Sequence, residues 1–141
     1  MATIPVDLVS AERAIFSGEA ERGYAPAILG EVGIAPGHTP LVTRLAPGEV
    51  RVRQENGEEE GFYVSGGMLE VQPKVVTVLS DTAMRAEDLD EAAVLKAREE
   101  AERQLHDRDA NIEYATALAK NAEAVAQLQA IRRMRKRTGR S

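Results

Sequence analysis

The chain contains no cysteine, which excludes disulfide bonds, thiolate metal sites and a cysteine nucleophile. Its two histidines, His38 and His106, are too few for a zinc site built from histidine. Tryptophan is also absent, and aromatic residues make up only 4% of the 141 residues. Since a single large core normally contains more of these bulky side chains, we expect a small core beside a region packed by alanine.

Long apolar runs and a positive overall charge are missing as well. No segment approaches the roughly 20 apolar residues that a helix needs to cross a membrane. The first residues lack the basic and apolar stretches of a secretory signal. The formal net charge of −5 argues against nucleic-acid binding by the protein as a whole. We therefore expect no direct membrane insertion and no nucleic-acid partner.

Glycine and proline are concentrated in the first part of the chain. Ten of the 11 glycines and all six prolines precede residue 74, whereas 13 alanines follow residue 85. Glycine and proline mark turns between strands, and alanine is the strongest helix former. We therefore predict a β domain over residues 1–85 and a helical domain over residues 86–141.

Several short segments alternate apolar and polar residues with the period of two that is typical of half-buried strands. They are Ile4–Leu8, Glu49–Gln54, a run around Phe62 and Val64, Met68–Gln72 and Val75–Leu79. Asn56-Gly57 lies between the second and third of these and favours the positive φ of a tight hairpin turn. Many short, closely spaced strands predict a sandwich or barrel.

No catalytic constellation accompanies these strands. The serines have no nucleophile-elbow context, and no helix start follows the glycines at 30, 33 and 37 to form a phosphate-binding loop. The segment Glu31–Leu41 contains two prolines and two glycines, which predicts a stiff, exposed loop. His38 is then either an ordinary surface histidine or part of a binding loop.

Two alanine-rich helices are predicted in the second domain. Asp88 and Glu91 form a capping box at the start of the first helix, and Asp109 or Asn111 caps the second. The predicted packing positions are Leu89, Ala93, Ala97, Ala101 and Leu105 on the first helix and Ala115, Ala119, Ala122 and Ala126 on the second, widened by larger residues that include Leu118, Leu128 and Ile131. The polar break between the helices predicts an antiparallel hairpin.

A hairpin packed mainly by alanine buries little surface. A buried CH₂-sized group contributes about 0.8 kcal/mol, against roughly 1.5–3 kcal/mol for a leucine or phenylalanine side chain. One hypothesis is therefore that the second helix can detach and bind elsewhere. The alternative is a static hairpin.

The last ten residues carry six positive charges and no negative charge. In contrast, residues 1–85 have a net charge of −5 and residues 86–131 a net charge of −6. Cations are favourable at the C-terminus of a helix, so the tail is either a solvated helix end or a segment that docks on an acidic protein surface. Membrane-surface binding would need interleaved bulky apolar residues, which the tail lacks.

In combination, four segments resemble the epsilon subunit of the bacterial F-type ATP synthase. They are VDLVSAERAIFSGEAE (6–21), GEVGIAPGHTPL (Gly30–Leu41), FYVSGGMLEVQPKVVTVLSDTA (Phe62–Ala83) and LDEA (Leu89–Ala92). The resemblance implies a flattened N-terminal β-sandwich of about ten strands followed by a C-terminal antiparallel two-helix hairpin.

The resemblance also implies a function. Members of this family belong to the rotating central stalk, which couples ion translocation to ATP synthesis, and they are not themselves enzymes. Such a subunit would bind the gamma subunit and the c-subunit ring as a peripheral protein on the cytoplasmic face of the cell (inner) membrane. Glu31 and His38 match positions that face the ring and gamma, and Ser10 and Ser65 match positions near gamma.

The helical domain of the family switches between a compact and an extended form. Extended, it reaches between gamma and the catalytic alpha and beta subunits and blocks ATP hydrolysis. By resemblance, the basic residues that would then meet an acidic surface on a beta subunit are Arg132, Arg133, Arg135, Lys136 and Arg137.

The sequence departs from the family in two places. Asp90 matches a nucleotide-binding pattern found in some relatives, but Ala93 replaces its arginine, so a phosphate loses its cationic partner. We therefore expect no tight ATP binding and no cofactor. The segment Tyr24–Leu29 is more apolar than expected in the foot region, and is either interface surface or a local change of strand.

The residues alone also bear on two other classes of protein. A free-standing β-sandwich adaptor would bind a partner through its helical hairpin. An enzyme would need a nucleophile–base pair or a set of metal ligands, and the sequence shows neither.

Overall fold

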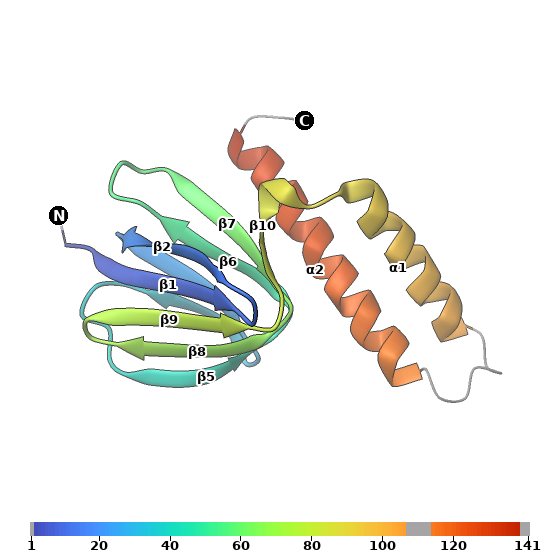
Figure 1. Cartoon of the computed structure of the whole chain (residues 1–141), viewed down its shortest axis with the longest axis horizontal. Helices are drawn as coiled ribbons and strands as arrows, with labels where there is room; N and C mark the ends of the chain where they lie inside the picture. Colours follow the sequence, from blue (N-terminus) through green and yellow to red (C-terminus); the bar gives the residue numbers. More distant parts are fainter. Residues whose placement is uncertain (1, 107–113, 139–141) are drawn as a thin grey trace.

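The structure is a computed structural model that describes residues 2–106 and 114–138. These residues form a β domain followed by a short 3₁₀ helix and two α-helices (Figure 1). The strands are β1 (Ile4–Ser10), β2 (Ala14–Ala20), β3 (Arg22–Ala27), β4 (Gly30–Ile34), β5 (Leu41–Leu45), β6 (Gly48–Arg53), β7 (Glu59–Val64), β8 (Gly67–Gln72), β9 (Val75–Ser80) and β10 (Ala83–Arg85). The helices are η1 (Ala86–Asp88), α1 (Glu91–His106) and α2 (Tyr114–Thr138).

The ten strands form one continuous sheet in the order β10-β7-β6-β3-β5-β8-β9-β1-β2, with β4 paired to β3. The β1–β9 pair is parallel and the other pairs are antiparallel. The sheet curls over itself, because β10 also lies near β1 and β2 (Figure 1). The predicted fold class, a sandwich of about ten strands followed by a helical pair, is confirmed.

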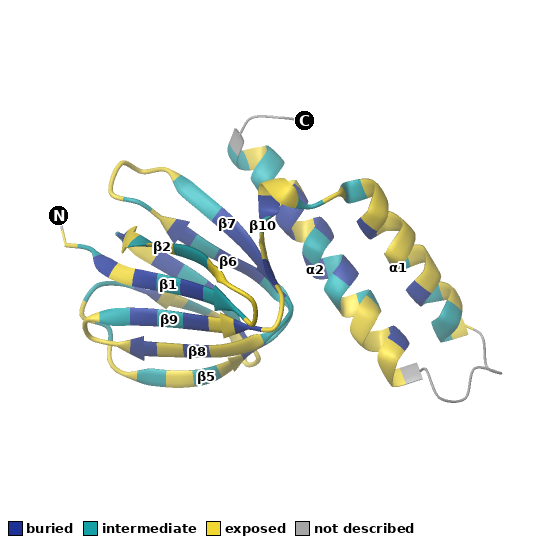
Figure 2. Cartoon of the chain, viewed as in Figure 1, coloured by how far each residue is buried: buried dark blue, intermediate teal, exposed yellow. Residues whose placement is uncertain are grey.

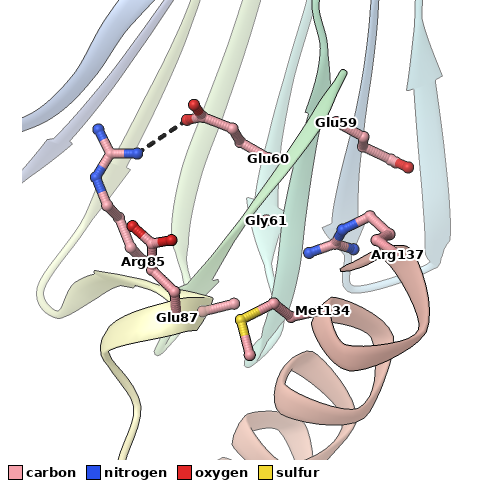
Figure 3. Close-up of a pocket in the computed structure, with 8 residues that line it drawn as sticks. Glu59, Glu60, Gly61, Arg85, Glu87, Met134 and Arg137 are labelled. Atoms are coloured by element: carbon pink, nitrogen blue, oxygen red, sulfur yellow. Dashed lines mark hydrogen bonds and ion pairs between the residues drawn. The ribbon is translucent and has the colours of Figure 1, made fainter. Parts of the chain in front are cut away.

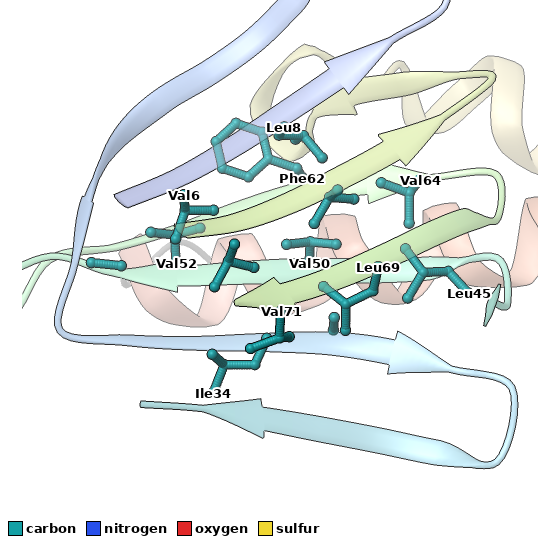
Figure 4. Packing of buried hydrophobic residues seen from close by; sticks show 14 of the residues in the cluster. Val6, Leu8, Ile34, Leu45, Val50, Val52, Phe62, Val64, Leu69 and Val71 are labelled. Atoms are coloured by element: carbon teal, nitrogen blue, oxygen red, sulfur yellow. The ribbon is translucent and has the colours of Figure 1, made fainter. Parts of the chain in front are cut away.

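The core lies between the two layers of the sandwich and is mainly aliphatic (Figure 4). Alternate residues of each strand point inward, as the period of two predicts. The inward residues of β1, β6 and β7 are Ile4, Val6, Leu8, Val50, Val52, Phe62 and Val64. Phe16 packs on Phe62 with a ring-centroid distance of 5.3 Å. The expected small, aromatic-poor core is therefore confirmed.

The predicted hairpin at Asn56-Gly57 is present, because β6 pairs antiparallel with β7 and Gly57 between them has a φ of 86°. Strands β8 and β9 form a second hairpin, in which Gln72 pairs with Val75. Gly67 at the start of β8 has a φ of 130°, and a Cβ there would overlap the backbone oxygen of Leu79. A side chain at position 67 would therefore separate β8 from β9.

The predicted loop Glu31–Leu41 is partly wrong. Its first residues belong to β4, which pairs with β3 from Gly23↔Ile34 to Ala27↔Gly30. Ile34 is buried in the core, so apolar burial holds this stretch in the sheet. The loop itself is limited to residues 35–40.

The predicted cap of the first helix is wrong by two residues. Asp90, and not Asp88, accepts hydrogen bonds from the backbone N–H groups of Ala92 and Ala93, at 3.1 and 3.4 Å from Oδ1. Asp88 instead belongs to η1, which extends the end of the β domain. The predicted caps of the second helix, Asp109 and Asn111, lie outside the described residues.

The predicted alanine stripes are largely wrong. Ala93, Ala97, Ala115, Ala119 and Ala122 are exposed, although Ala101 and Ala126 are buried. A spacing of four residues drifts around a helix that turns once every 3.6 residues, so it leaves the contact face after a few steps. The contact between the helices is instead a cluster of Val94 with Ala124, Leu128 and Ile131.

Helix α2 has two contact faces (Figure 2). One face packs on α1, which runs antiparallel to it, and the other packs on β6, β7 and η1. Two faces spread the buried positions around the helix, which explains why no single stripe describes them. None of the described helices is long and apolar enough to span a membrane.

The difference in burial along α2 predicts unequal effects of two leucine substitutions. Leu128 is 2% exposed between the helices, whereas Leu118 on the same helix is 45% exposed. We expect Leu128→Ala to cost about 2–5 kcal/mol of local stability and Leu118→Ala less than about 0.5 kcal/mol. Amide hydrogen exchange of α2 in the purified chain measures both, and equal effects would contradict this packing.

Candidate functional site

The basic end of α2 lies on the β domain. Arg137 places Nη2 3.2 Å from Oε2 of Glu49 and Nη1 3.5 Å from Oε1. Arg133, one turn earlier, places Nη1 3.6 Å from the same Oε1. Arg135 points to the other side and pairs with Glu91 at the start of α1. The tail therefore contacts both the sandwich and the first helix.

Glu49 is an outward-facing strand residue that α2 covers. Its neighbours along β6 alternate, with Val50 and Val52 in the core, so Glu49 faces away from the core. Only 1% of its side chain is exposed. Because α2 packs on the outer face of β6 and β7, the helix encloses a carboxylate that the sheet alone would leave in water.

Gly61 provides the space for this ion pair. A Cβ at position 61 would overlap both Oε2 of Glu49 and Nη2 of Arg137. Gly61 lies within β7 and is not among the glycines with positive φ, so the strand conformation does not require glycine there. Glycine is required there by the close approach of Glu49 and Arg137. Figure 3 shows Arg137 reaching from α2 toward Gly61.

Tyr63 is the other outward residue of β7 that α2 covers. It pairs with Glu49 across the β6–β7 ladder and is 1% exposed. Burial raises the pKa of the Tyr63 phenol from 10.0 to about 12; the negative charge of Glu123 adds to the rise, and the side chain of Gln127 opposes it. The interface thus favours the neutral phenol.

Of the five basic residues predicted to contact another subunit, three have partners within the chain and two are exposed. Arg133, Arg135 and Arg137 pair within the chain, while Arg132 and Lys136 are exposed. Their predicted contacts with catalytic subunits remain predictions. Glu49, Gly61 and Tyr63 were not predicted as functional residues, because an outward strand residue looks the same in sequence whether or not a helix covers it.

The two residues predicted to face the ring lie at β4 and its following turn. Glu31 accepts a 2.6 Å hydrogen bond from Nη2 of Arg51, and the Arg51 guanidinium lies 4.5 Å from the centroid of the Tyr24 ring. The Nδ1 atom of His38 is 2.6 Å from the backbone oxygen of Thr39. Glu31 is therefore held in place by its neighbours, and its contact with a ring remains a prediction.

The apolar segment Tyr24–Leu29 shows no unusual strand arrangement, and its role as interface surface remains a prediction. Its first residues belong to β3, whereas Ile28 and Leu29 are 56% and 95% exposed at the turn into β4. The tip of this hairpin is therefore apolar surface.

Ser10 and Ser65 lie at the same end of the sandwich. Ser10 pairs with Ser80 in the parallel β1–β9 ladder, and the hydroxyl oxygen of Ser65 is 3.4 Å from that of Ser80. Ser65 Oγ also accepts a hydrogen bond from the backbone N–H of Thr82. The structure thus brings together two residues that are 55 positions apart in the sequence.

Exposed apolar side chains lie beside this end. Met68 is opposite Leu79 in the β8–β9 ladder and opposite Arg44 in the β5–β8 ladder. Met68 and Leu79 are 39% and 50% exposed, and Val42, on the same face of β5 as Arg44, is 65% exposed. This face therefore mixes exposed apolar side chains with the exposed charged residues Arg44 and Glu70.

Asp90, the residue that matches a nucleotide-binding pattern, serves as the cap of α1, and Ala93 is exposed on the first turn. A cavity of about 200 Å³ lies nearby between β7, η1 and the end of α2 (Figure 3). Its charged lining is Glu59, Glu60, Glu87, Arg85 and Arg137. Both arginines are already paired, Arg85 with Glu60 at 2.9 Å and Arg137 with Glu49.

Comparison with known proteins identifies the family. A model described as "ATP synthase, Delta/Epsilon chain, beta-sandwich domain" matches residues 3–86, and one described as "ATP synthase, Delta/Epsilon chain, long alpha-helix domain" matches residues 87–132. The chain belongs to the ATP synthase delta/epsilon chain family. The resemblance found in the sequence is thereby confirmed.

Individual relatives agree over almost the whole chain. The ATP synthase epsilon chain of Nitrosococcus oceani is 61% identical over 137 residues, which cover 97% of this chain and 98% of the relative. The ATP synthase epsilon chain of Alkalilimnicola ehrlichii is 58% identical over 140 residues, which cover 99% and 100%.

Solved structures share the fold. A chain in the cryo-EM structure of the Euglena gracilis mitochondrial ATP synthase, which contains OSCP, F1 and the c-ring, matches with a TM-score of 0.77 at 28% identity, covering 91% of this chain and 82% of that one. A chain of the central stalk and c-ring of the Tetrahymena thermophila mitochondrial ATP synthase matches with a TM-score of 0.58 at 15% identity, covering 92% and 97%. The second match shows the fold alone.

The raised pKa of Tyr63 predicts a loss of stability at high pH. The folded state prefers the neutral phenol, so this contribution is fully present below the ordinary pKa of 10.0 and is lost as the pH rises toward about 12. Urea unfolding from about pH 9 to about pH 11 should show a steeper decline for the wild type than for Tyr63→Phe, which cannot ionise. Equal slopes would show that folding does not raise the pKa of this phenol.

The charges around the cavity predict weak nucleotide binding. Three carboxylates face two arginines that already have partners, and the cavity is smaller than the roughly 300–1,000 Å³ of typical ligand pockets. Isothermal titration of the purified chain with magnesium-ATP should give no saturable heat at micromolar concentrations. Saturable binding in that range would contradict this expectation.

Proposed function

We propose that this chain is a central-stalk subunit of an F-type ATP synthase that takes part in coupling ion translocation to ATP synthesis and restrains ATP hydrolysis through its helices. The observation that carries the proposal is the match of both domains to one family over almost the whole chain. The subunit itself is non-catalytic, and the chemistry takes place in the alpha and beta subunits.

The β domain attaches the subunit to the rotor. Its contact with the c-subunit ring uses the foot around Glu31 and His38, and its contact with gamma uses the end around Ser10 and Ser65. The exposed apolar residues Met68 and Leu79 beside that end support a protein partner there, since such residues are costly to leave in water. Through the ring, the subunit is held as a peripheral protein at the cytoplasmic face of the cell (inner) membrane.

The helical domain regulates the complex. In the structure it is compact, with α1 resting mainly on α2 and α2 resting on the outer face of the sandwich. We infer an extended form in which α2 leaves this face and reaches the catalytic alpha and beta subunits. Its basic end then meets an acidic surface, which would explain why six positive charges are concentrated in the last ten residues of an acidic protein.

The whole domain can be tested first. ATP hydrolysis by the assembled complex is compared with and without residues 86–141 of this chain, and we expect higher hydrolysis without them. Copurification with gamma and the c ring checks that the β domain still assembles. Equal hydrolysis in a fully assembled complex would refute the regulatory role.

The exposed side of the basic tail gives a sharper prediction. Arg132→Gln combined with Lys136→Gln should raise hydrolysis by roughly twofold or more, because each exposed ion pair contributes about 0.2–1 kcal/mol. Both residues are exposed, so the compact form is unaffected.

A matched control removes two positive charges from the other helix of the same hairpin. Lys96 and Arg103 are exposed on α1, and Lys96→Gln with Arg103→Gln should leave hydrolysis unchanged. If both double variants raise hydrolysis equally, general charge and not the tail is responsible.

A further inference from the structure

We propose that the outer face of β6 and β7 contains a built acceptor site for the basic end of α2, centred on Glu49, which competes with the catalytic subunits for the same arginines. This inference rests on the proposed function for the identity of the competitor. It assigns Glu49, Gly61 and Arg137 a regulatory role.

The acceptor site uses both oxygens of one carboxylate. Oε2 faces Nη2 of Arg137, and Oε1 is shared by Nη1 of Arg137 and Nη1 of Arg133. The two arginines are four residues apart, so they project from the same side of α2. Arg137 is 18% exposed and Glu49 only 1% exposed. Two positive charges thus converge on one enclosed negative charge.

The site exists only while α2 is docked. The sandwich holds Glu49 on its outer face, where water would solvate the carboxylate if the helix left. In the docked form, removing the charge of Glu49 leaves the largely enclosed guanidinium of Arg137 without its partner, which is strongly unfavourable. In the undocked form, both partners regain water. Such a site stabilises the docked position of α2 and still permits the helix to leave.

Gly61 shows that the site is shaped for a guanidinium. It lies opposite Arg51 in the β6–β7 ladder, at an outward position where most residues would place a side chain under α2. Absence of the Cβ leaves the space that Glu49 and Arg137 occupy. The neighbouring Tyr63 closes the other end of the same face.

Occupancy of the acceptor site and inhibition exclude each other. The arginines that Glu49 holds are part of the basic end that the proposed function assigns to an acidic surface of a beta subunit. A guanidinium enclosed against Glu49 is unavailable to that surface, and α2 is covered by the sandwich along the same side. Weakening the acceptor site should therefore strengthen inhibition, while weakening the tail should relieve it.

The first test uses the purified full-length chain. Glu49→Gln keeps the shape of the side chain and removes its charge, and Gly61→Ala pushes Glu49 and Arg137 apart without changing any charge. Each should raise amide hydrogen exchange along α2 on the order of tenfold or more, with the protection of the sandwich strands retained. Unchanged exchange of α2 in both variants would overturn the acceptor site.

Matched controls are available for both substitutions. Glu70→Gln removes the charge of an exposed carboxylate on β8, a strand that pairs with β5 and β9 and not with β6 or β7. Gly33→Ala adds a Cβ to a strand glycine with ordinary φ, where the nearest atom, a Tyr24 ring carbon, is 3.6 Å away. Neither should change the exchange of α2, and a change as large as that of Glu49→Gln would attribute the effect to general destabilisation.

A double substitution tests the pairing itself. If Glu49 acts through Arg137, then Arg137→Gln should have little further effect in a Glu49→Gln background. Fully additive effects on exchange would show that the two residues act separately and would overturn the assignment.

The second test uses the assembled complex. We expect Glu49→Gln and Gly61→Ala to lower ATP hydrolysis, because the released tail reaches the catalytic subunits more often. If the variants release α2 in the purified chain but leave hydrolysis unchanged, the acceptor site stands and the proposed inhibitory function fails. If α2 is not released, the acceptor site fails whatever the hydrolysis shows.

Discussion

The compact arrangement depends on the contact of α2 with the outer face of β6 and β7. Helix α1 packs mainly on α2, so its position relative to the sandwich follows from that of α2. This contact combines the buried ring of Tyr63 with the ion pair at Glu49. The attraction of an enclosed ion pair is largely offset by the cost of removing both charges from water. The ion pair therefore makes the position of α2 specific while adding little net stability.

This balance links the packing of the molecule to its proposed role. A helix held by a large aliphatic interface would stay docked, because its release would expose apolar surface. Here the apolar cluster of α2, around Leu128 and Ile131, faces α1 and can move with the hairpin. The face toward the sandwich is largely charged or polar at its C-terminal end. In the proposed function, release exchanges these ion pairs for others on a catalytic subunit.

The strands were predictable because burial on one side of a sheet leaves a local signature of period two. Val50, Val52, Phe62 and Val64 all carry this signature and all lie in the core. The helix contacts were less predictable, because α2 packs on two partners and its buried positions do not form one stripe. The cap at Asp90 was missed because the short helix η1 occupies the residues where a helix start was expected.

By itself, the sequence determined the division into a β part and a helical part, the positive tail and the family. These properties depend on composition and on patterns between near neighbours. Only the tertiary structure decided that Glu49 is enclosed and that Arg137 is its partner. The two are 88 residues apart, and strand alternation says only that Glu49 points outward. What covers an outward side chain depends on where a distant helix packs, and no local pattern contains that information.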